Sequence, residues 1–110
     1  MKQYVVDELR PGDREKIKAY LDARFGPPEI SGIYWIPLAE DILSDIQSKH
    51  SACQPFYFAI NLESTTLSCE LLVRTLEKMK CDCMGYATET QRNWIVEFVD
   101  SIFEKNSIKT

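Results

Sequence analysis

The sequence feature that most constrains the fold is a pair of alternating segments, residues 56–62 and 67–75, separated by a polar turn at residues 63–66. In each segment apolar residues occupy every second position, as expected of strands that bury one face. A turn centred near residues 64 and 65 predicts the pairs Phe56–Val73, Phe58–Leu71, Ile60–Cys69 and Leu62–Leu67. A slip by one residue would mix the two faces, so both strands indicate the same antiparallel hairpin.

A third strand is predicted over residues 79–86, after a turn around residues 76–78. In this strand Met79, Cys81 and Cys83 alternate with Lys80, Asp82 and Met84. Because burying charged side chains is costly, the two thiols are expected on the core face. The sequence therefore predicts a meander of three antiparallel strands.

Three helices are predicted from apolar residues at helical spacing, over residues 11–25, 38–49 and 90–105. Pro11 suits the first position of the first helix, and Thr88 with Gln91 fits a capping box at the start of the third. Two short runs of strand-forming residues, 4–6 and 32–36, precede the first and second helices. The expected fold class is α+β, a meander extended by these two strands with the helices packed mainly on one face.

Length and composition favour a single cytoplasmic domain. The chain has 110 residues, 45% of them hydrophobic, which suffices for one core, and residues 106–110 are expected to fray. A net charge of −4 offers no basic surface for nucleic acid or an anionic membrane. No apolar run has the length of a membrane span or the position of a secretion signal. In a reducing compartment the cysteines are free thiols or metal ligands.

The one histidine and the four cysteines all lie between residues 50 and 83. His50, Cys53, Cys81 and Cys83 have the ligand types and the number of a tetrahedral zinc site. The C-x-C spacing and the distance between strands would hold these side chains apart unless the chain folds back at residues 54–55 or a bulge forms near Cys81. In the alternative that we favour, Cys69, Cys81 and Cys83 are buried apolar residues, as free cysteines usually are. A structural zinc ion remains the second hypothesis.

A thiol enzyme is the third hypothesis, with Cys53 as nucleophile and His50 as base three residues earlier. Against it, both residues follow a predicted helix C-terminus, where the partial negative charge disfavours a thiolate. With a single histidine, no other catalytic set can be assembled. The sequence leans towards a protein without catalytic activity.

The polar face of the predicted meander is a candidate binding surface. If the helices cover the apolar face, a partly apolar centre ringed by charges lies open to a protein partner or to a second copy. The alternative is a solvated sheet. Tyr34 and Trp35 are consecutive, so one of them must point away from the core. The sequence thus predicts a non-catalytic interaction or accessory module whose candidate binding residues are Tyr57, Asn61, Glu70, Leu72 and Arg74.

Overall fold

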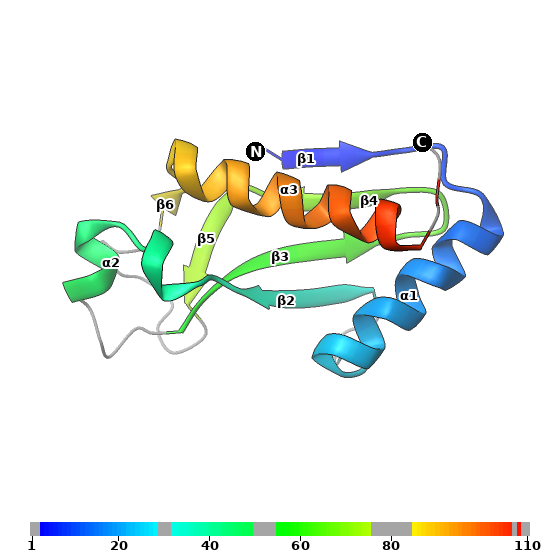
Figure 1. Cartoon of the computed structure of the whole chain (residues 1–110), viewed down its shortest axis with the longest axis horizontal. Helices are drawn as coiled ribbons and strands as arrows, with labels where there is room; N and C mark the ends of the chain where they lie inside the picture. The colour runs from blue at the N-terminus through cyan, green and yellow to red at the C-terminus, as the bar shows by residue number, and fades with distance from the viewer. Residues whose placement is uncertain (1–2, 29–31, 50–54, 76–84, 107, 109–110) are drawn as a thin grey trace.

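Strand β3 (Phe56–Leu62) is the centre of a six-stranded antiparallel sheet in a computed structural model that describes residues 3–28, 32–49, 55–75, 85–106 and 108. One edge of β3 pairs with β2 (Ile33–Pro37). The other edge pairs with β4 (Leu67–Glu70) and then with β5 (Leu72–Thr75). Beyond these, β1 (Gln3–Val6) pairs with β4 and β6 (Gly85–Tyr86) pairs with β5, as Figure 1 shows.

The two long helices, α1 (Pro11–Phe25) and α3 (Glu89–Lys105), pack on the same face of the sheet (Figure 1). The ring of Trp94 in α3 stacks on Phe58 of β3 with 6.3 Å between the ring centroids. Phe25 at the end of α1 meets Phe98 of α3 edge-on at 5.9 Å. These contacts confirm the α+β fold with helices gathered on one face.

The hydrophobic core lies between this face and the helices. Fully burying a large apolar side chain stabilises the fold by about 1.5–3 kcal/mol, so the central strand and the inner helix faces carry most of the stability. Ile108, in the segment expected to fray, is also buried, and its N–H donates to the carbonyl of Phe103 at 2.9 Å. The large side chains with the least exposure are Ile17, Leu21, Ile36, Phe56, Phe58, Ile60, Leu67, Val73, Ile95, Val99 and Ile102.

The predicted hairpin forms, but its register changes half-way along. The pairs Ile60–Cys69 and Leu62–Leu67 are confirmed. The pairs Phe56–Val73 and Phe58–Leu71 are wrong, because Phe56 lies opposite Thr75 and Leu71 interrupts the strand. Between the two registers, residues 70–73 stand opposite residues 58–59. Since the offset is two residues, Val73 and Thr75 still point into the core.

The prediction of one continuous helix over residues 38–49 is wrong. The chain instead forms a short 3-10 helix, η1 (Glu40–Ile42), and a separate helix, α2 (Asp45–Lys49). Leu38 still belongs to the sheet, because its N–H donates to the carbonyl of Phe56 at 2.9 Å. Leu43 is extended, and Ser44 caps α2 through a 3.3 Å bond from the N–H of Gln47.

The other predicted elements have mixed outcomes. The capping box of Thr88 and Gln91 is confirmed at the start of α3. Of the predicted third strand, residues 85 and 86 form β6, whereas residues 79–84 lie outside the described part of the chain. Among the described helices, none is both long and apolar enough to cross a membrane.

Candidate functional site

The sheet face opposite α1 and α3, called the open face below, is the candidate site. No described helix covers it, whereas the other face carries both long helices. Its strand residues alternate with the core residues and are mostly half-buried or exposed. The described strand residues on the open face are Gln3, Val5, Ile33, Trp35, Pro37, Tyr57, Ala59, Asn61, Ser68, Glu70, Leu72, Arg74 and Tyr86.

An aromatic pair marks one side of the open face. The rings of Trp35 in β2 and Tyr57 in β3 meet edge-on, with 6.4 Å between centroids and 74° between planes. Both side chains are only partly buried. Further exposed apolar side chains lie on the same face near the edge opposite β2: Val5 of β1 is 44% exposed, and Tyr86 of β6 is 53% exposed. These apolar side chains, which share one face of the sheet, make that face a candidate interaction surface.

The charges on the open face are few and paired. Glu70 and Arg74 are the only charged residues among its described strand positions, and Arg74 Nε lies 3.0 Å from Glu70 Oε2. Asn61 donates from Nδ2 to Oε1 of Glu63 at 3.1 Å. A partly exposed ion pair contributes about 0–1 kcal/mol to stability, so Glu70 and Arg74 add little to the stability of the fold.

All five residues predicted as binding residues occur on the open face: Tyr57, Asn61, Glu70, Leu72 and Arg74. The structure also decides between Tyr34 and Trp35, because Tyr34 is 3% exposed in the core and Trp35 lies on the open face. The sequence did not predict that Val5 and Tyr86 belong to the open face. Their placement depends on the pairing of β1 with β4 and of β6 with β5, for which the alternation of single strands gives no signal.

The residues proposed for zinc binding or thiol catalysis, His50, Cys53, Cys81 and Cys83, lie outside the described residues. Within the described ranges, no three His, Cys, Asp or Glu side chains gather as they would around a metal ion. The zinc and thiol-enzyme hypotheses therefore stay predictions.

Cys69 is described, and its surroundings make it a core residue. It is fully buried between strands, paired with Ile60 on one side and with Tyr4 on the other. Burial, together with the nearby charge of Glu70, raises the pKa of the Cys69 thiol to about 12. Because the thiolate is the reactive form, Cys69 is unsuited to nucleophilic or redox chemistry near neutral pH.

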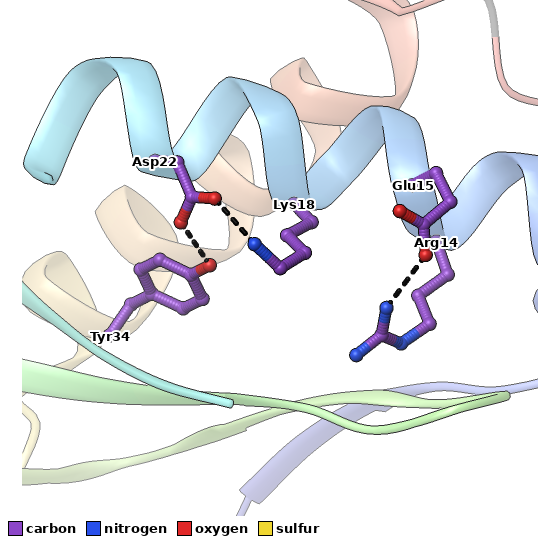
Figure 2. A network of polar contacts seen from close by, with 5 residues as sticks. All are labelled: Arg14, Glu15, Lys18, Asp22 and Tyr34. Carbon is purple, nitrogen blue, oxygen red and sulfur yellow. Dashed lines mark hydrogen bonds and ion pairs between the residues drawn. The ribbon is translucent and has the colours of Figure 1, made fainter. Parts of the chain in front are cut away.

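A polar link fastens α1 to the sheet on the side opposite the open face (Figure 2). Tyr34 donates its hydroxyl to Asp22 Oδ1 at 2.6 Å, and Lys18 Nζ donates to Asp22 Oδ2 at 2.7 Å. The bonds from Lys18 and then from Tyr34 lower the pKa of Asp22. Burial and the bond to Asp22 raise the pKa of Tyr34 to about 12. The hydroxyl of Tyr34 is thus held as a neutral donor in a structural role.

Comparison with known proteins identifies no relative: no family model matches the chain, and neither a curated protein nor a solved structure is significantly similar to it.

Proposed function

We propose that the chain is a non-catalytic protein-interaction module that dimerises through the open face of its sheet. The observation that carries this proposal is the Trp35–Tyr57 ring pair on a sheet face that no described helix covers. Tyrosine and tryptophan are enriched at protein interfaces, where they bury large areas and keep a polar group for hydrogen bonding. A cytoplasmic location, as predicted from the sequence, is part of the same proposal.

A second copy of the chain suits the open face because apolar side chains lie on both sides of it. Ile33, Trp35 and Tyr57 lie on β2 and β3, and Val5, Leu72 and Tyr86 lie on β1, β5 and β6. In a two-fold dimer the same surface of each copy meets itself in the reversed direction, so the β2 side of one copy can face the β1 side of the other. Two sheets that stack in this way pack about 10 Å apart.

The charge distribution also favours self-association through this face. The chain has a net charge of −4, so two copies repel one another at most orientations. At the described strand positions of the open face the charges of Glu70 and Arg74 cancel, and the carboxylate of Glu63, bonded to Asn61, stands at one end of the face. Contact through these strand positions therefore brings little net charge together, and a two-fold axis permits Glu70 of one copy to meet Arg74 of the other.

Light scattering on the chromatographed full chain tests the proposal. We expect a mass of twice the 12.7 kDa of one chain, and we expect Leu72→Glu to return it to that of a monomer. The matched control is Ile46→Glu, which adds the same charge at a position on α2 that is 50% exposed and away from the open face. A wild-type chain that remains monomeric at high concentration would contradict the dimer, and a heterologous protein would then be the occupant to test.

A further inference from the structure

A cavity lies at the free edge of β2, where this edge borders the open face. Its volume is about 360 Å³, and it is lined by residues 25–28, at the end of α1 and in the turn after it, and by residues 33–35 of β2. Ile33 and Trp35 point to the open face, whereas Tyr34 points to the core. A cavity that touches all three must lie at an edge of the strand. Since β3 pairs with the other edge, the cavity lies at the free one.

The main-chain groups at this edge can be assigned from the pairing of β2 with β3. The N–H of Leu62 donates to the carbonyl of Gly32 at 2.7 Å, and the N–H of Leu38 donates to the carbonyl of Phe56 at 2.9 Å. In an antiparallel ladder every second residue makes such bonds, so residues 32, 34, 36 and 38 direct their polar groups to β3. Residues 33, 35 and 37 direct theirs outward, where no described strand lies.

Among the described residues of this outward edge, Pro37 is the one usual guard against strand addition, and it stands at the end of β2 and leaves Ile33 and Trp35 open. Natural edge strands are commonly guarded by charged side chains, prolines, bulges or a covering element. No residue of β2 is charged, and its register with β3 runs without a bulge over five residues. Pro37 occupies an outward position, where the missing N–H costs no bond of the sheet. We propose that β2 binds an extended peptide segment of a partner protein as an additional antiparallel strand.

The geometry defines how the peptide is held. The peptide residue opposite Trp35 exchanges two main-chain hydrogen bonds with it, the residue opposite Ile33 exchanges two more, and the carbonyl of Pro37 accepts a fifth. The peptide residue opposite Tyr34 points to the α1 side of the sheet and enters the cavity. The described lining residues are uncharged and include Phe25, Pro27 and Pro28, so we expect an apolar peptide side chain here. The bond from Tyr34 to Asp22 fixes α1 above this edge (Figure 2).

A peptide suits this edge better than a folded partner does. Stable interfaces between folded proteins bury about 1,200–2,000 Å², far more than the edge of one short strand provides. The end of α1 and the prolines after it line the same cavity, so the edge is approached along a confined path. A single extended chain needs only the five residues of β2 and the cavity beside them. Main-chain bonds then supply affinity and the cavity supplies selectivity.

Selection of random linear peptides displayed on phage against the full chain provides the test. We expect the enriched peptides to share uncharged, strand-forming sequences with one apolar position. N-methylation at the peptide residues opposite Ile33 and Trp35 should weaken binding by about tenfold or more, because each replaced N–H removes a hydrogen bond. N-methylation at the alternate residues, whose N–H groups point away from β2, is the matched control and should change affinity little.

Amide hydrogen exchange locates the bound peptide. We expect exchange at Ile33 and Trp35 to slow by about tenfold or more when the selected peptide is added. The proposal is overturned if no peptide is enriched, if both N-methylation patterns weaken binding equally, or if exchange at Ile33 and Trp35 is unchanged by the bound peptide. Leu72→Glu, which targets the open face and not this edge, should leave peptide binding intact even where it abolishes the dimer. The two proposals can therefore fail independently.

Discussion

The side chain of Gln91 donates from Nε2 to Oε1 of Gln47 at 2.7 Å in the interior of the protein. Each glutamine also completes a capping box, Gln91 with Thr88 at the start of α3 and Gln47 with Ser44 at the start of α2. The carbonyl of Ile42 accepts a further bond from Gln91 at 2.9 Å. The first turns of two helices and η1 are thus joined through one carboxamide pair.

Replacing one member of this pair should destabilise the fold. Gln91→Leu removes the Nε2 donor that Oε1 of Gln47 and the carbonyl of Ile42 share, and it removes the acceptor of the Thr88 N–H in the capping box. We expect these losses to cost about 1–3 kcal/mol of unfolding free energy. Urea denaturation followed by circular dichroism measures this change. The comparison is a double-mutant cycle with Gln91→Leu, Gln47→Leu and the variant that combines them. The loss of unfolding free energy in the combined variant should differ from the sum of the two single losses, and the difference is the coupling energy of the pair. Simple additivity would contradict the link.

Gly32 should tolerate substitution far less than Gly12. Gly32 has φ +84°, and a Cβ built there would lie 2.8 Å from the carbonyl oxygen of Leu62. We expect Gly32→Ala to lower stability by about 1–3 kcal/mol, from backbone strain alone and before any clash. Gly12, in α1, has no heavy atom within 4 Å of such a Cβ. Gly12→Ala should be neutral or stabilising by up to about 1 kcal/mol. Thermal unfolding of both variants compares them, and equal losses would contradict the assigned geometry.

The hydroxyl of Tyr34 should make stability fall in alkaline solution. Its pKa is raised from 10.0 to about 12 in the folded state. Above pH 10 the unfolded chain therefore releases a proton that the folded chain keeps, so this contribution is fully present below pH 10 and is lost as the pH rises towards 12. Tyr34→Phe should reduce the slope of stability against pH in this window. Tyr57→Phe, on the open face, is the control, and an unchanged slope in Tyr34→Phe would contradict the prediction.

The thiol of Cys69 should be inert in the folded protein. It is fully buried, and its pKa is raised to about 12. Iodoacetamide applied near neutral pH, followed by peptide mass spectrometry, should leave Cys69 unlabelled in native protein and label it fully in urea. Leu21→Ala, which opens a cavity elsewhere in the core, provides a destabilised comparison in which labelling should speed up through more frequent unfolding. Rapid labelling of native wild-type protein would contradict this placement.

The hairpin shows how far alternation alone can predict the fold. It identified the faces of residues 56–62 and 67–75, together with the pairs Ile60–Cys69 and Leu62–Leu67. It did not detect the interruption at Leu71, because an offset of two residues leaves every side chain on the face that the pattern assigns. The pattern of one strand therefore determines its buried face, whereas the pairing between strands depends on contacts that the pattern does not contain.

The second predicted helix and the candidate site show two further features that the sequence pattern did not predict. Ser44 and Gln47 have the spacing of a capping box, which marks the start of α2 in the sequence, whereas the apolar stripe runs through this position without a break. The choice between Tyr34 and Trp35 had no such signal, because both suit a strand equally well. It is the pairing of β2 with β3 that buries Tyr34 beside Ile60 and places Trp35 beside Ala59 on the open face.

The offset at Leu71 also bears on how the length of this chain can change during evolution. Removing one residue between Cys69 and Val73 would invert the positions of β5, bringing Arg74 into the core and Val73 out of it. Removing two would restore the straight pairing and keep both faces. Insertions and deletions at this point should therefore be inherited in steps of two, and homologous chains that differ here by a single residue would contradict this reading of the sheet.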